Sequence, residues 1–281
     1  METIGSQKIW SFLSDEPEAT SNTAVRKSQG LHVSNYLDLA QRVSTLQYLN
    51  RDFVLMFRGQ DKDFTNQQGN TTLKATIYRG ARVPGAEYPD RFNHLKRAED
   101  LLEFQYGEAG FRGITRLRRQ RILRWAILQH YEICPTPLLD VTHSLRIAAS
   151  FASATKNRTA FLYVLGLPNL SGAITASAEA GLQVVRLSSV CPPEAMRPHI
   201  QEGYLLGEYP DMDRPEQKNL YRSYEIDFGL RLIAKFRFEP EAFWKKSRAF
   251  PPIPTEALYP SASNDPMNRI AQEIITALTR S

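Results

Sequence analysis

Apolar residues recur at different intervals along the first part of the chain, and the intervals predict both helices and strands. Residues 53–57 form a short apolar run typical of a strand, which ends at Arg58, Gly59 and Gln60. The polar residues 60–72 predict a loop, and residues 73–77 a second extended segment. Before this strand, Ser34 can cap a helix whose apolar face is formed by Leu37, Leu39, Ala40, Val43 and Leu46.

The middle of the chain has mainly helical spacing. Residues 94–109 and 114–130 predict two helices, and Thr142 or Ser144 can cap a third that ends near residue 154. The second of these helices is unusual because many arginines alternate with its apolar positions: Arg112, Arg116, Arg118, Arg119, Arg121 and Arg124.

Strands are expected again at residues 160–165, 183–187 and 199–206, whereas residues 226–238 fit a strand or a helix equally well. Residues 208–218 predict a charged loop that contains proline. Asp265, followed by Pro266, predicts the start of a terminal helix.

These elements predict an α+β protein with one core and an appendage at each end. The polar residues 1–30 predict a loosely held, flexible N-terminal arm, and residues 31–250 the domain itself. The prolines of residues 251–254 indicate a linker, so residues 251–281 are expected to form a Pro-rich linker and a C-terminal helix.

Composition narrows the class of protein. The chain has 281 residues, 42% of them hydrophobic, and its longest apolar runs fall well short of the roughly 18 residues that span a bilayer. Because the N-terminus lacks a secretion signal and the two cysteines lie far apart, we expect a cytoplasmic protein without disulfides. The net charge of +5 is compatible with a polyanionic partner, but many proteins without one carry such a charge.

Arg58 is the first candidate for chemistry. A strand fixes its backbone, Gly59 permits close approach of a ligand or of backbone, and the guanidinium can bind phosphate or carboxylate with two hydrogen bonds. The alternative is a structural ion pair near the surface.

A second block of motifs, together with the first, resembles the FRG domain family, whose name comes from the signature that Phe57, Arg58 and Gly59 match. The resemblance extends over residues 34–206, with core motifs in 53–206. It rests on Leu73, Ile77, Arg79, Gln129, His130, Tyr131, Pro135, Thr136, Leu138, Leu139, Asp140, Thr142, Ala148, Phe151, Ala152, Arg197, Gln201, Gly203 and Tyr204. The sequence departs from the family pattern at Glu132, Pro137 and Val141, and Pro137 stands where an arginine is common.

The layout of this family is in turn similar to that of the arginine-type ADP-ribosyltransferases. That resemblance implies a split, mostly antiparallel β core flanked by helices, with NAD bound in the split. It implies that Arg58, Asp140 and Gln201 form the catalytic group, with Arg58 on the NAD phosphates and Gln201 near the position of the catalytic glutamate. The residues that would bind NAD are Arg58, Gly59, Gln60, His130, Tyr131 and Thr142.

Several of these residues have a structural alternative. His130 and Tyr131 can be a hydrogen-bonded core histidine and a core aromatic, and Asp140 can orient Arg58 or His130 rather than react. Because Gln201 cannot carry the negative charge that assists glycosyl transfer, and Glu202 would point to the opposite face of a strand, activity does not follow from the layout.

Two functions are therefore expected. The first is an NAD-using ADP-ribosyltransferase that modifies a macromolecular target, as a bacterial or phage toxin or an antiphage defence effector. The second is a non-catalytic module that senses a nucleotide or nucleic acid. For the second, Arg116, Arg118, Arg119 and Arg121 would contact nucleic acid or an acidic protein, unless they are simply the solvated face of a helix. No cluster has the spacing of metal ligands, so no metal is expected.

Overall fold

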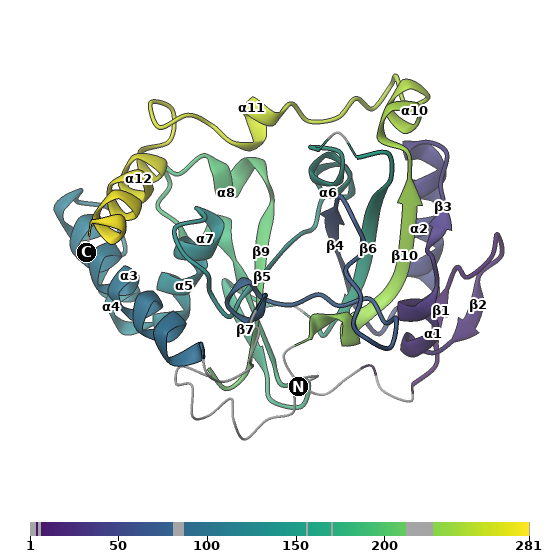
Figure 1. Ribbon diagram of the computed structural model, residues 1–281, viewed down its shortest axis with the longest axis horizontal. Coiled ribbons are helices and arrows are strands. Elements are labelled where there is room, and N and C mark those ends of the chain that lie inside the picture. Colours follow the sequence, from purple (N-terminus) through teal and green to yellow (C-terminus); the bar gives the residue numbers. More distant parts are fainter. Residues whose placement is uncertain are drawn as a thin grey trace.

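A sheet of eight strands forms the centre of the molecule, with the strand order β3-β10-β6-β4-β5-β9-β8-β7 (Figure 1). The computed structural model describes residues 4, 7–80, 87–155, 157–169, 171–211 and 227–280. All neighbouring strands of this sheet are antiparallel except β3 and β10, which are parallel. The predicted α+β class, with a mostly antiparallel sheet and flanking helices, is confirmed. The strands of the sheet are β3 (Leu31–His32), β4 (Val54–Gln60), β5 (Leu139–Thr142), β6 (Ala160–Leu167), β7 (Ile174–Ser177), β8 (Leu182–Arg186), β9 (Gly203–Glu208) and β10 (Leu232–Phe238).

The helices lie around this sheet in three groups. Near β3 and β10 are α1 (Asn22–Lys27), α2 (Tyr36–Leu49) and α10 (Pro240–Lys245). Beyond β5 are α3 (Tyr88–Glu108), α4 (Ile114–Arg119), α5 (Arg121–His130) and α12 (Pro266–Thr279). The short helices near the middle are α6 (Leu145–Ala152), α7 (Leu187–Val190), α8 (Arg197–Ile200), α11 (Thr255–Leu258) and the 3-10 turns η1 (Thr76–Tyr78) and η3 (Phe228–Arg231).

The sheet is split at its centre. Strand β4 pairs with β6 along its whole length, from Val54 opposite Leu167 to Gln60 opposite Phe161. On its other side, β4 pairs with β5 at one registered position, Phe57 opposite Thr142. The sheet therefore consists of two halves, one of β3, β10, β6 and β4 and the other of β5, β9, β8 and β7, which diverge away from the Phe57–Thr142 pair.

Two predicted elements differ from the structure. Residues 199–206 were expected to be one strand, but α8 occupies Arg197–Ile200 and β9 begins at Gly203. Pro198 fits the first turn of a helix, and Glu202 has a positive φ of 44°, so the chain turns before it becomes a strand. The expectation that Glu202 points to the opposite face of a strand is therefore wrong.

The arginine-rich segment is likewise two helices rather than one. Gln120 adopts an extended conformation (φ −122°, ψ 102°) and separates α4 from α5. The expected extended segment at residues 73–77 instead enters the 3-10 turn η1. The cap of α2 is Asn35 instead of Ser34, and Leu37, expected on its apolar face, is 59% exposed.

The N-terminal residues that the structure describes are not a loose arm, which corrects the prediction for residues 7–30. They form a hairpin of β1 (Ile9–Ser11) and β2 (Glu18–Thr20), followed by α1. Ile9 and Val25 are each 1% exposed and belong to the core. The prediction failed because it rested on the polar average composition of the segment, whereas a few apolar side chains are enough to anchor it to the core.

The C-terminal part contains the predicted helix. Asp265 caps α12 by accepting hydrogen bonds from the backbone N–H groups of Met267 and Asn268, and α12 packs against α3. The predicted linker at residues 251–254 leads into the short helix α11. Of the loop expected at residues 208–218, residues 212–218 lie outside the described part of the chain. None of the described helices is long and apolar enough to cross a membrane.

Candidate functional site

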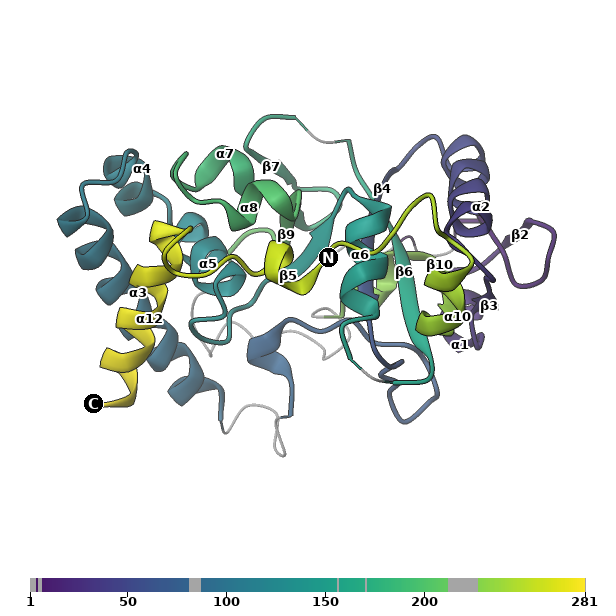
Figure 2. The same ribbon diagram turned by 90° about the horizontal axis from the view of Figure 1, so that it is seen from above.

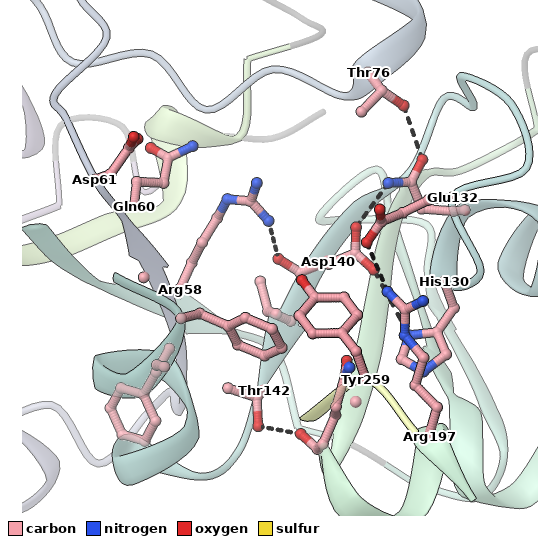
Figure 3. A pocket seen from close by; sticks show the side chains of 18 of the residues that line it. Arg58, Gln60, Asp61, Thr76, His130, Glu132, Asp140, Thr142, Arg197 and Tyr259 are labelled. Carbon is pink, nitrogen blue, oxygen red and sulfur yellow. Dashed lines mark hydrogen bonds and ion pairs between the residues drawn. The ribbon is translucent and has the colours of Figure 1, made fainter. Parts of the chain in front are cut away.

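A cavity of about 480 Å³ lies where the two halves of the sheet diverge, within the size range of small-molecule sites (Figure 3). Strands β4 and β5, helix α6 and residues from α5, α8 and the C-terminal part form its walls. Its lining residues are Phe57, Arg58, Gly59, Gln60, Asp61, Phe64, Thr76, Arg79, Gln129, His130, Glu132, Asp140, Val141, Thr142, Ala148, Phe151, Thr155, Arg197, Gln201, Gly203 and Tyr259.

Arg58 extends from β4 across the split toward β5. Its Nη1 donates a hydrogen bond of 2.5 Å to the backbone oxygen of Asp140, whereas its buried Nε has no hydrogen-bond partner in the described residues (Figure 3). Burial, together with the nearby charge of Arg79, lowers the pKa of Arg58 to about 10 against the opposing effect of Asp140. Arg58 is therefore still a cation at neutral pH, and it has donor capacity left for an anion.

Gly59 is required by the fold of the site. A Cβ atom there would lie 1.8 Å from the backbone oxygen of Ala148 and 2.8 Å from the backbone nitrogen of Ala152. Both atoms belong to α6, so the absent side chain lets α6 pack directly on β4. The sequence suggested that either backbone or a ligand approaches Gly59 closely, and the structure shows that the backbone of α6 does so.

Asp140 on β5 is held by a chain of hydrogen bonds. Gln129 donates from Nε2 to Oδ2 of Asp140 at 2.7 Å, and its own Oε1 accepts from the hydroxyls of Thr76 and Thr136. Burial alone would raise the pKa of Asp140, but His130, Arg58 and Gln129 outweigh it and hold that pKa below the usual value. The side chain, which is 38% exposed, therefore presents a negative charge to the cavity at neutral pH.

His130, at the end of α5, lies behind this carboxylate. Its Nδ1 is 3.9 Å from Oδ1 of Asp140, and the buried Nε2 has no hydrogen-bond partner among the described residues. Burial lowers the pKa of His130 despite the favourable effect of Asp140. The ring is therefore neutral at pH 7, and Asp140 is the charged member of the pair.

Thr142 and Gln201 connect β5 with the chain after α8. Thr142 donates from Oγ1 to the backbone oxygen of Gln201 at 2.8 Å. The side chain of Gln201 lines the cavity, but its Nε2 donates to the backbone oxygen of Leu258 at 2.7 Å. The amide group expected near the position of the catalytic glutamate thus binds the C-terminal part of the chain.

Tyr131 does not line the cavity, so its predicted position in the NAD site is wrong. It is 3% exposed, and its hydroxyl donates to Oδ2 of Asp265 at 2.9 Å. The alternative interpretation, a core aromatic with a satisfied hydroxyl, describes it. Its hydrogen-bond partner lies 134 residues away in sequence, which the local motif does not reveal.

The arginines proposed for a macromolecular partner lie outside the cavity on α4 and α5. Arg118 pairs with Glu103 at 3.1 Å and Arg121 with Glu99 at 3.0 Å, so part of their charge is balanced within the protein. Arg116 and Arg119 are exposed, and Arg116 donates to the backbone oxygen of Ser189.

The structure adds cavity residues that sequence reasoning had not assigned to the site, notably Arg79, Arg197 and Tyr259. Arg79 and Arg197 occupy motif positions of the family pattern, and these positions could have identified them as residues of the site. Arg197 donates to Oε1 of Glu132 at 2.7 Å, and its guanidinium lies 4.6 Å from the ring centre of Tyr259. Tyr259 lies in the predicted linker region, and no motif in the sequence pointed to it as a residue of the site.

Metal and thiol chemistry have no visible basis in the described residues. Among them, no three His, Cys, Asp or Glu side chains converge as a metal site requires. Both cysteines are buried, and burial raises the pKa of Cys134 to about 12, so this thiol is protonated at neutral pH.

The arrangement brings a cation, an anion and an aromatic ring into one cavity, on the segments that carry the sequence motifs. Residues 54–160 match the family model of the FRG domain. Neither the curated proteins nor the solved structures include a match to this chain. The matched span includes Arg58, His130 and Asp140 and confirms the FRG resemblance over these residues, whereas the late motif from Arg197 to Tyr204 lies outside it. Residues 54–160 therefore match the FRG domain.

Proposed function

We propose that the cavity binds NAD and that the protein transfers ADP-ribose from it to a macromolecular acceptor. The single observation that carries this proposal is the position of the Arg58 guanidinium and the Asp140 carboxylate on facing strands of one cavity. The layout expected from the ADP-ribosyltransferase resemblance requires such a pair across a split sheet.

The charges in the cavity suit the two parts of NAD. Arg58 and Arg79 both line the cavity, burial lowers the pKa of each, and the charge of Arg79 further lowers the pKa of Arg58. Two guanidinium groups that line one cavity are favourable for an anion such as the pyrophosphate of NAD, because the anion offsets their charge and accepts their hydrogen bonds.

Asp140 would assist the reaction itself. When the bond between nicotinamide and C1′ of the ribose breaks, nicotinamide leaves with the bonding electrons and positive charge develops on the ribose. The acceptor atom then forms its bond to C1′ and releases a proton. An ionised carboxylate stabilises that positive charge, and Asp140 is ionised at neutral pH whereas Gln201 is an amide bound to Leu258.

Incubation with labelled NAD and a cell lysate tests the proposal. Wild type should release nicotinamide and transfer label, and Arg58→Ala and Asp140→Asn should each reduce both at least about 100-fold. Arg51→Ala removes an exposed arginine just before the same strand and should leave both unchanged. Wild type that neither binds NAD nor releases nicotinamide would exclude the proposed function.

One observation favours a second candidate, a binding module without catalysis. Gln201, at the position expected for the catalytic glutamate, has its amide engaged with Leu258. If this function holds, wild type should bind RNA or DNA in a salt-dependent way, and charge reversal at Arg118 and Arg119 should weaken binding. Arg58→Ala should then have no effect, which distinguishes the two candidates.

A further inference from the structure

Residues 251–265, here called the C-terminal segment, run across the cavity side of the molecule. Figure 2 shows this stretch, with α11 in its middle, passing from α10 near α6 to α12 beside α3. It therefore spans the region where the two halves of the sheet diverge. The matched FRG span ends at residue 160, so this segment is a contribution from outside it.

Side chains of the domain fix the C-terminal segment at several points. On one half, Ser150 of α6 accepts a hydrogen bond from the backbone N–H of Ile253 at 2.9 Å. On the other, Gln201 donates to Leu258, and Asp265 accepts from the Tyr131 hydroxyl. Tyr131, expected to bind NAD, and Gln201, expected in the catalytic group, thus hold this segment in place.

Tyr259 is the residue that these contacts present to the cavity. Arg197 lies against its ring at 4.6 Å from the centroid, and Phe151 contacts it edge-on at 5.9 Å with an interplanar angle of 83°. Tyr259 nevertheless remains 40% exposed and lines the cavity that contains Arg58 and Asp140 (Figure 3). Its ring is therefore oriented by Arg197 and Phe151, which leave it only partly covered.

We infer that Tyr259 is a ligand-binding residue whose ring stacks on an aromatic base of the nucleotide held in the Arg58 cavity. This inference rests on the proposed function, because NAD supplies the base. A pocket that binds a dinucleotide needs an apolar surface for a base as well as cations for phosphate, and the cavity supplies both, because Tyr259, Arg58 and Arg79 line it together.

The contacts separate a stacking role from a purely structural one. Gln201 binds the segment through the backbone oxygen of Leu258, and Asp265 binds through its own side chain, so neither contact uses the Tyr259 ring. Loss of the ring should therefore leave the segment attached while removing a surface for the base.

Titration of the full chain with two probes, NAD and inorganic pyrophosphate, tests this inference by calorimetry. Tyr259→Ala should weaken NAD binding roughly tenfold, as the loss of an aromatic stacking surface does, and should leave pyrophosphate binding within about twofold of wild type. Tyr259→Phe, which keeps the ring, should bind NAD as wild type does. Arg58→Ala should weaken the binding of both probes. Tyr48→Ala, which changes a 65% exposed tyrosine on α2, should weaken the binding of neither.

Each other result overturns the inference in a recognisable way. Equal binding of NAD by wild type and Tyr259→Ala would show that the ring does not contact the ligand, with the proposed function intact. Equal weakening of both probes would show that Tyr259 shapes the cavity without stacking. If wild type does not bind NAD at all, the proposed function fails, and the inference fails with it. Thermal unfolding of Tyr259→Phe and Tyr259→Ala checks that both are folded.

Discussion

At the residue scale, the cavity depends on groups whose charge is set by their surroundings. His130 is buried and neutral, and Asp140 in front of it is ionised. Arg58 bonds to the backbone oxygen of Asp140, so the carboxylate oxygens remain available to Gln129 and to the cavity. The charge of the site therefore results from a division of roles between neighbouring side chains.

The lowered pKa of His130 predicts how stability depends on pH. The folded state binds this proton more weakly than the unfolded state does. His130 therefore contributes no loss of stability above the pKa of the unfolded state, which is near 6.5, and the folded state loses stability as the pH falls from there toward the folded pKa. The loss is at most about 1.4 kcal/mol per pH unit for one proton. Urea unfolding between pH 7 and 5 should show a smaller decrease for His130→Gln than for wild type.

Asp140 should act in a separate and more acidic window. Its lowered folded pKa contributes stability that is present above the unfolded value near 3.9 and lost as the pH falls below it. An equal decrease between pH 7 and 5 in wild type and His130→Gln would therefore contradict the role given to His130, whatever Asp140 contributes.

Gly59 gives a second prediction at this scale. Gly59→Ala should lower the free energy of unfolding by about 3 kcal/mol, because the new Cβ would overlap the backbone of α6 and no side-chain rotation can relieve that contact. Gly107→Ala is the matched control, because Gly107 lies in α3 and a Cβ atom there would have no neighbour closer than 3.9 Å. It should raise stability by up to about 1 kcal/mol through higher helix propensity. Similar values for both variants in urea unfolding would contradict the close packing of α6.

At the element scale, apolar spacing predicted the longer helices and the strands β4, β6 and β8, but it missed β3, β5 and β7 and revealed few of the interactions between elements. The run at 53–57 led to β4, and the Asp265–Pro266 pair to α12, because both signals are local. The helix α8 was missed because it is only four residues long and is separated from β9 by a turn at Glu202. The motif residues Arg58, His130, Asp140 and Thr142 were expected together and lie in one cavity. Tyr131 and Gln201 were assigned wrong partners because Asp265 and Leu258 approach them only in the folded chain.

The connection of α12 to the domain gives a prediction at this scale. Asp265 is fully buried and accepts hydrogen bonds from Tyr131, from the backbone of Arg197 and from the first turn of α12. Asp265→Ala should therefore lower the free energy of unfolding by roughly 2 to 4 kcal/mol. It should also increase protease cleavage between residues 251 and 265. Asn264→Ala, at the exposed neighbouring position, should change neither measurement, and wild-type behaviour of Asp265→Ala would refute this connection.

At the scale of the whole molecule, the described N-terminal residues are tied to distant parts of the chain. The N-terminal helix α1 is joined to the start of η3 by an ion pair of 2.5 Å between Arg26 and Asp227, with side chains 9% and 5% exposed. Asp227 also accepts a hydrogen bond from the backbone N–H of Leu73, which connects the loop after β4 to the same point. Composition alone suggested a separate arm because it does not record such long-range pairs.

Removal of this ion pair should affect the entire fold. Arg26→Ala leaves the buried Asp227 carboxylate without its cation and should lower the free energy of unfolding by about 3 kcal/mol. Lys27→Ala, at the adjacent exposed position of α1, should change it by less than about 0.5 kcal/mol. Equal stabilities of the two variants in urea unfolding would show that the N-terminal helix is dispensable.

The narrow junction between β4 and β5 has a consequence for how the family signature should be understood. One registered pair, Phe57 with Thr142, connects the two halves of the sheet in the described residues, so their angle is governed mainly by what lies outside the sheet. The stretch from Ile253 to Asp265 attaches to both halves. A fragment limited to residues 54–160 would therefore keep the contact between Arg58 and Asp140 but lose the stretch that attaches to both halves of the sheet.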